Sequence, residues 1–193
     1  MAIVINGSGT VTGLAVGGLP DGTVDSGTIA TGTILPADMA NGGNKVLQVV
    51  NVQDGAVATS TTVMGAVDDT IPQNTEGSEI MTLAITPTSA TSKLKIEVVV
   101  NSSHSVDSWG VMALFQDTTA NALASSFIYQ DVATGSSIFT FNHYMTAGTT
   151  SATTFKVRAG SPSAGTFTFN GTGVGGRFGG TIASSITITE IEA

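Results

Sequence analysis

Two histidines are the residues of this sequence best suited to proton transfer near neutral pH. His104 has Ser103 and Ser105 on either side and Asp107 shortly after it, so the chemical groups of a nucleophilic triad occur together. Groups so close on one turn seldom reach triad geometry, and a serine beside a histidine is expected by chance in a serine-rich chain. We therefore expect His104 on a solvated loop, His143 within a strand, no catalytic residue, and a protein that is not an enzyme.

Acidic side chains gather in the segment that contains Asp68, Asp69, Glu76 and Glu79. Carboxylate oxygens are the ligands that Ca²⁺ and Mg²⁺ prefer, and two carboxylates held about 5 to 10 Å apart would suit glycoside hydrolysis. The segment has no EF-hand spacing, the sequence has no cysteine for a thiolate site, and a carboxylate pair is neither shown nor forbidden. We expect these acids to hydrate the surface and predict no metal and no cofactor. A polysaccharide-degrading enzyme stays a third alternative.

A glycine-rich segment, residues 171–176 (GTGVGG), fits the G-x-G-x-x-G pattern of dinucleotide-binding turns. That function also needs a helix directly after the turn, within a βαβ unit. Here Arg177, Phe178 and a terminal strand follow. The sequence therefore predicts a wide loop or a close backbone approach, not a nucleotide site.

Aromatic residues are scarce, at 6% of the chain. Trp109, Tyr129, Tyr144 and Phe178 would be able to stack on sugar rings if they are exposed, because an aromatic ring offers an apolar face. Packing in a core or an interface is the commoner role for such residues. A glycan on a host surface is therefore one partner to consider for these four side chains.

Charge limits the partners of this chain. Charged residues make up only 10% of the sequence and the formal net charge is −8. This balance argues against partners whose affinity comes from neutralising phosphates or anionic lipids, so we expect no nucleic acid and no membrane insertion. No stretch approaches the roughly 18 apolar residues of a membrane span.

The elements that must position these residues are strands. Glycine, with 24 residues, serine and threonine dominate the composition, while strong helix formers are few. Leu94, Ile96 and Val98 alternate with charged residues, as in a half-buried strand. Predicted strands cover residues 46–53, 57–64, 81–85, 94–100, 109–116, 125–130, 137–146, 153–158, 166–170 and 181–191. Short strands separated by turn formers predict an all-β fold, an antiparallel β-sandwich or jelly roll, over residues 45–193.

Two of these strands carry apolar side chains on both alternating faces, at residues 109–115 and 138–145. One face would meet the sandwich core, and the other needs a second cover. A neighbouring subunit is the simplest cover for a chain with so few surface charges, and the alternative is a loop of the chain itself. The sequence predicts oligomer-interface residues at Trp109, Val111, Phe115, Phe139, Phe141 and Tyr144.

Residues 1–44 differ from the rest, because they contain no lysine, arginine, histidine or aromatic residue. Such a segment buries too little apolar surface to form its own core and gains order only against other chains. We call it the leader and expect it to be an extended, Gly/Thr-rich anchor, with a flexible tail as the alternative. The predicted anchor residues are Val11, Leu14, Leu19, Ile34 and Leu35.

Five segments together resemble the virion appendage proteins of marine phages, such as tail fibres. They are residues 11–24 (VTGLAVGGLPDGTV), 32–39 (GTILPADM), 45–51 (KVLQVVN), 85–96 (ITPTSATSKLKI) and 184–191 (SSITITEI). The resemblance implies a homotrimeric fibre or spike on the particle surface, with an N-terminal segment that docks to other virion proteins and a C-terminal jelly-roll head. It carries over no catalytic residue.

The chain departs from such fibres in two respects, since it has no long shaft and no His-x-His pattern. A short head fibre or a capsid decoration protein is therefore an alternative to a tail fibre. A carbohydrate-binding adhesin that recognises a host surface glycan is the competing class.

Overall fold

The computed structural model describes residues 45–193 except residue 174. The leader, with the predicted anchor residues Val11, Leu14, Leu19, Ile34 and Leu35, lies outside the described residues. Every predicted strand is present, although residues 57–64 contribute a shorter one than expected. The strands are β1 Val46–Asp54, β2 Ala58–Ser60, β3 Ser78–Ile85, β4 Lys93–His104, β5 Ser108–Gln116, β6 Ala124–Gln130, β7 Ser136–Thr146, β8 Thr153–Gly160, β9 Phe167–Phe169, β10 Gly171–Thr172, β11 Gly175–Gly176 and β12 Ser184–Ile191.

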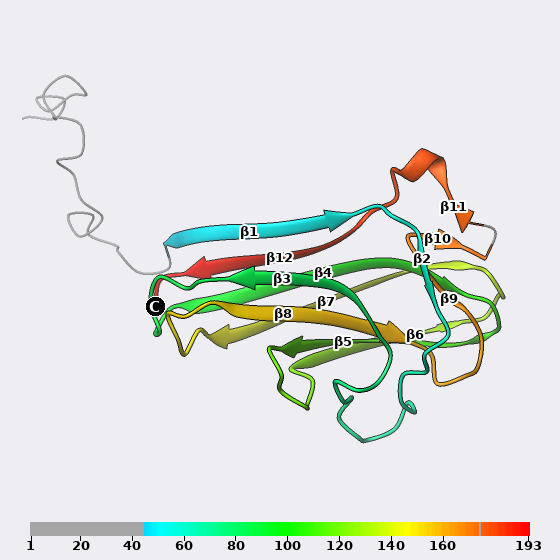
Figure 1. Cartoon of the computed structure of the whole chain (residues 1–193), viewed down its shortest axis with the longest axis horizontal. Helices are drawn as coiled ribbons and strands as arrows, with labels where there is room; N and C mark the ends of the chain where they lie inside the picture. Colours follow the sequence, from blue (N-terminus) through cyan, green and yellow to red (C-terminus); the bar gives the residue numbers. More distant parts are fainter. Residues whose placement is uncertain (1–44, 174) are drawn as a thin grey trace, which may run out of the picture. The chain divides into compact units, whose positions relative to one another are not determined.

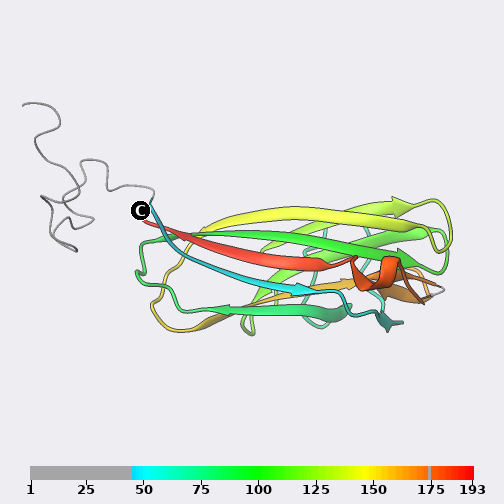
Figure 2. The ribbon, with the colours of Figure 1, turned by 90° about the horizontal axis from the view of Figure 1, so that it is seen from above.

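Eight long strands form two antiparallel sheets that pack face to face (Figures 1 and 2). The first sheet has the order β1-β12-β4-β7. The C-terminal residues of β4 also pair with β9, and β9 pairs with β2. The second sheet has the order β3-β8-β5-β6. Consecutive long strands alternate between the sheets, except that β5 and β6 pair within the second sheet, and this is the arrangement of a jelly roll. The predicted fold class, an antiparallel β-sandwich of jelly-roll type, is confirmed.

Alternation along the strands places the core. Leu94, Ile96 and Val98 of β4 are fully buried between the sheets, as are Ile186 and Ile188 of β12. Intervening residues face outward, where Lys95 and Glu97 form an ion pair with an N–O distance of 2.8 Å. Because the side-chain period of a strand is two, each of these strands contributes one apolar face to a single core.

Strand β5 is buried on both faces, as its sequence predicts. Met112 and Leu114 enter the core between the sheets, whereas Val111 and Phe115 form a second apolar cluster on the outer face. Met64, which belongs to the connection between β1 and β3, covers this outer cluster. The cover is therefore a loop of the chain itself, the alternative that the sequence left open.

The two ends of the sandwich differ. The chain enters at Lys45 and leaves beside it, where the Glu192 amide donates a hydrogen bond of 2.8 Å to the Lys45 carbonyl. The connections β1–β3, β4–β5, β6–β7 and β8–β12 meet the sheets at the opposite end, here called the distal end. Two of them, residues 55–77 and 161–183, are the longest loops of the fold. Loops on a rigid scaffold commonly carry function, so the distal end is the place to search.

The glycine-rich segment at the distal end contains no helix that could accept a phosphate. Gly171 pairs with Gly176 in a two-residue ladder, β10–β11, and a short 3₁₀ turn at Phe178–Gly180 follows. Across the described part of the chain no helix is long and apolar enough to span a membrane. The same residues hold no group of three or more histidine and acidic side chains placed to bind a metal ion.

Candidate functional site

Three exposed aromatic side chains lie together on the outer face of the second sheet, near the distal end. Trp109 of β5 stands opposite Tyr129 of β6 in the ladder, and Phe127 lies two residues earlier on the same face of β6. The Trp109 ring meets Phe127 and Tyr129 edge to face, with ring centroids 5.3 and 5.0 Å apart. The exposed fractions are 37% for Trp109, 59% for Phe127 and 50% for Tyr129. We call these three residues the aromatic cluster.

Local sequence explains why the cluster forms. Strand residues i and i+2 share a face, so Phe127 and Tyr129 project together, and the β5–β6 register brings Trp109 between them. The sequence prediction included Trp109 and Tyr129 but missed Phe127. Its position two residues before Tyr129 was the signal that would have found it.

A hollow of about 140 Å³ adjoins the cluster on the Phe127 side. Its walls are Phe127 and Ser125 of β6 and the segment 66–72 of the β1–β3 connection, which includes Asp68. Hydrogen bonds from the Thr70 hydroxyl and backbone amide lower the pKa of the Asp68 carboxyl below its ordinary value. Asp68 is therefore ionised at neutral pH and ready to accept hydrogen bonds from a ligand.

A second hollow of about 220 Å³ adjoins the cluster on the Tyr129 side, at the β6–β7 turn. Gln130 lines it and is only 3% exposed. Its Nε2 donates to the Gly135 carbonyl at 3.3 Å and to the Ser137 hydroxyl at 3.1 Å. Its Oε1 has no hydrogen-bond partner among the residues described. An unsatisfied buried acceptor costs stability, and because this oxygen is enclosed by protein it is not offered to a ligand in the hollow.

Together these features favour one kind of ligand. Exposed ring faces attract the apolar C–H face of a ligand, and the hydroxyl, amide and carboxylate groups of the two hollows suit a ligand rich in hydroxyls. Both hollows are smaller than the roughly 300 Å³ at which enclosed small-molecule pockets begin. A ligand would therefore lie across the surface and place only parts of itself in them.

His104 does not take part in a triad, and the expectation that it lies on a solvated loop is wrong. β4 continues to His104 because its last residues pair with β7 and β9, which leaves the imidazole 2% exposed. Its Nδ1 lies 3.1 Å from the Val106 carbonyl oxygen. His143 lies within β7, as expected, and partial burial lowers its pKa.

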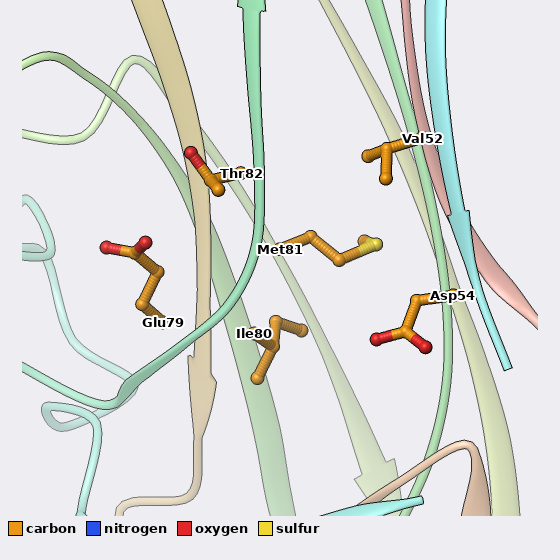
Figure 3. Close-up of a pocket in the computed structure, with 6 residues that line it drawn as sticks. All are labelled: Val52, Asp54, Glu79, Ile80, Met81 and Thr82. Atoms are coloured by element: carbon orange, nitrogen blue, oxygen red, sulfur yellow. The ribbon is translucent and has the colours of Figure 1, made fainter. Parts of the chain in front are cut away.

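The gap between β1 and β3 holds a third hollow, of about 290 Å³ (Figure 3). Figure 3 shows Val52 and Met81 pointing toward one another across it, with the Asp54 carboxylate beside them. The Glu79 carboxylate points away from the gap and pairs with Lys156, with an N–O distance of 3.7 Å. Asp54 and Glu79 both line this hollow, but their carboxylates do not face one another across it, as the two acids of a glycosidase must.

The six predicted interface residues separate into two groups. Val111, Phe115 and Phe139 are buried inside the chain, and Phe141 is half-buried against the core. Phe139 fits there because it packs on Gly110, where an added Cβ would lie 2.5 Å from the ring. Only Trp109 and Tyr144 are exposed, on the outer faces of opposite sheets. An interface of this fold has these two side chains available, and the interface itself stays a prediction.

Comparisons with known proteins add little to this picture. No protein-family model matches the chain, and no curated protein matches it. Among solved structures it is similar to a sugar-binding protein, the C-terminal domain of EclA, with 17% identity, a TM-score of 0.35, and coverage of 58% of this chain and 72% of that one. It is also similar to the VP2 subviral particle of infectious bursal disease virus, with 14% identity, a TM-score of 0.32, and coverage of 76% of this chain and 37% of that one. With TM-scores this low, neither likeness supports an inference about function.

Proposed function

We propose that the protein is a phage virion component, a short appendage whose jelly-roll head binds a host surface glycan through the aromatic cluster. The observation that carries the binding role is the cluster itself. Three large aromatic side chains remain exposed, with Trp109 in contact with each of the other two, beside two hollows. A group of exposed aromatic side chains commonly marks a surface that binds a ligand or a partner.

The position of the cluster supports this role. Trp109 is the second residue of β5, directly after a distal connection, and the chain enters the sandwich at the other end. A head that is held through the residues before Lys45 would present the cluster away from its attachment. This polarity is what an attachment protein needs.

The virion assignment rests on sequence resemblance and fold class. The five segments that resemble phage appendage proteins span both the leader and the head. Jelly rolls recur in viral capsid and lectin domains, which suits either a particle protein or a glycan-binding one. We propose a homotrimer that docks to other virion proteins through its leader. A capsid decoration protein and a free adhesin are the alternatives.

Immobilised glycans test the binding role. We expect the full chain to bind at least one of dextran, laminarin and galactomannan, and Trp109→Ala or Tyr129→Ala to weaken binding about tenfold, because loss of one stacking ring removes about 1.4 kcal/mol. Phe178→Ala is the control, since Phe178 is 80% exposed, lies in the 3₁₀ turn outside the cluster and is not a predicted interface residue. Equal losses in the control, or binding to no glycan at all, would contradict the proposal.

Purified particles test the virion role. We expect mass spectrometry of particles from infected cells to detect the chain, and gold-labelled antibodies against the head to decorate the particle surface. Absence of the chain from intact particles would leave the free adhesin as the better explanation.

A further inference from the structure

We infer that the aromatic cluster selects uncharged glycans and discriminates against acidic ones, an inference that rests on the proposed glycan-binding function. Carboxylates flank the cluster, and within the described residues no lysine or arginine lines the two hollows beside it. The carboxylates belong to the turns and loops next to β5 and β6. The negative charge beside the cluster is therefore a local property of the site, in addition to the negative net charge of the chain.

Carboxylates flank the cluster at two ends, beyond the Trp109–Tyr129 pair and beside Phe127. Asp107 precedes Trp109 by two residues and Asp131 follows Tyr129 by two, and both are exposed. Asp68 lines the hollow beside Phe127, and Asp131 lines the hollow beside Tyr129. A ligand that covers the three rings and extends beyond them therefore comes near a carboxylate on the Phe127 side and on the Tyr129 side.

No lysine or arginine side chain lines either hollow within the described residues. The nearest candidates along the second sheet lie on β8, and both are engaged. Lys156 pairs with Glu79, and Arg158 donates hydrogen bonds of 2.7 Å to the carbonyls of Glu76 and Gly77. Lys93 and Lys95 belong to β4, in the other sheet.

Recognition of an acidic sugar needs a partner for its negative charge. Arginine or lysine usually supplies it, because charge-assisted hydrogen bonds to a carboxylate or sulfate are the strong ones. Here the ligand anion would meet Asp68 and Asp131 instead, and like charges repel at these distances. A neutral sugar hydroxyl, in contrast, can donate a hydrogen bond to either carboxylate. The same residues thus favour the neutral ligand and disfavour the acidic one.

Matched ligands test this selectivity on the full chain. The probes are dextran, laminarin and galactomannan, each beside its own carboxymethyl derivative, at low and at physiological ionic strength. We expect each derivative to bind at least about tenfold more weakly than its parent at low ionic strength. The difference should narrow in salt, because exposed charges are screened within about 8 Å at 0.15 M.

Variants locate the effect. Asp68→Asn and Asp131→Asn should each reduce the difference in affinity between a parent glycan and its carboxymethyl derivative. Asparagine keeps an acceptor oxygen but loses the negative charge. Glu97→Gln is the control, because it removes one exposed charge from the outer face of the first sheet. We expect Glu97→Gln to leave the ratio of the two affinities, parent to carboxymethyl derivative, unchanged.

The outcomes separate this inference from the proposed function. Derivatives that bind as tightly as their parents, with Trp109→Ala weakening both, would overturn the selectivity and leave the glycan-binding role standing. Binding to none of the neutral or acidic probes would overturn both. If only a basic probe such as polylysine binds, and Trp109→Ala abolishes it, the site takes a basic protein partner and both are wrong.

Discussion

Glu190 shows how a single buried charge is accommodated without a cation. Its side chain is 0% exposed on the inner face of β12. The carboxylate accepts hydrogen bonds from the Thr88 amide at 2.8 Å, the Ser92 hydroxyl at 2.6 Å and the Gln48 amide nitrogen at 2.6 Å. Glu190 thereby joins the end of β12, the β3–β4 turn and the edge strand β1.

The pKa of Glu190 has two opposing causes. Burial alone would raise it, but the hydrogen bonds from Ser92, Gln48 and Thr88 outweigh burial and lower the pKa below its ordinary value. A carboxyl whose pKa is lower in the folded than in the unfolded protein stabilises the fold above the unfolded pKa, about 4.3 for glutamate. That stability is lost as the pH falls from there through the folded pKa.

Glu190→Gln should destabilise the fold by roughly 2 to 4 kcal/mol at pH 7. The donors that bind the two carboxylate oxygens of Glu190 would find a single acceptor oxygen in the glutamine amide. Urea unfolding followed by circular dichroism measures this loss. The variant should also show a weaker fall in stability between about pH 5 and pH 3. Glu97→Gln, whose ion pair with Lys95 is exposed, should cost less than about 1 kcal/mol. Equal effects of the two substitutions would contradict this role for Glu190.

At the scale of elements, the connection between β1 and β3 acts as a cover for the second sheet. Met64 lies buried over Val111 and Phe115, and its amide donates to the Ser161 carbonyl at 3.0 Å. Arg158 of β8 fastens the other end of the connection by donating to the Glu76 and Gly77 carbonyls. The first hollow beside the aromatic cluster depends on this loop, because segment 66–72 forms one wall.

Arg158→Ala should loosen the connection while the core between the sheets stays folded. We expect faster hydrogen exchange at the amides of Met64 and Gly77, and more fluorescence from a dye that binds apolar surface, since Val111 and Phe115 become accessible. Lys156→Ala is the control, because Lys156 lies on the same face of β8 and makes only a long ion pair. Unchanged exchange at Met64, or equal effects in the control, would show that Arg158 does not hold the loop.

The sequence predicts the positions of the strands better than it predicts which segments of the chain pack on them or pair with them. Alternation along β4 and β12 is local information, so the inner faces with Ile96 and Ile188 could be placed correctly. The cover of β5 could not, because Met64 reaches Phe115 only through a long loop that other residues hold. The burial of His104 was missed for the same reason, since pairing with β9 is a long-range contact. The site was predicted in part, at Trp109 and Tyr129 but not at Phe127.

At the scale of the whole molecule, the head and the leader should be separable. Residues 45–193 contain every aromatic residue of the chain and a continuous core. A truncated chain that starts at Asn44 should therefore fold, stay soluble and form the proposed trimer, as measured by circular dichroism and light scattering. Added to particles that lack the protein, it should fail to bind them, because the leader supplies the contact with other virion proteins.

Three results would contradict this division. Unfolding of the truncated chain would show that the leader completes the core. A stable monomer at micromolar concentration would remove the trimer as a property of the head. Truncated protein that still decorates particles would place the anchor in the sandwich.

The placement of β1 has a mechanical consequence. β1 begins at the end where the chain enters and runs toward the distal end, and among the described strands its ladder partner is β12, from Val46 opposite Ile191 to Asp54 opposite Ser184. A pull between the residues before Lys45 and a ligand on the aromatic cluster acts along the axis of β1. The ladder is then loaded in shear, so its hydrogen bonds bear the force together instead of opening one after another. A head anchored in this way would hold a drifting particle against a surface under flow, because release requires the whole strand to slide at once.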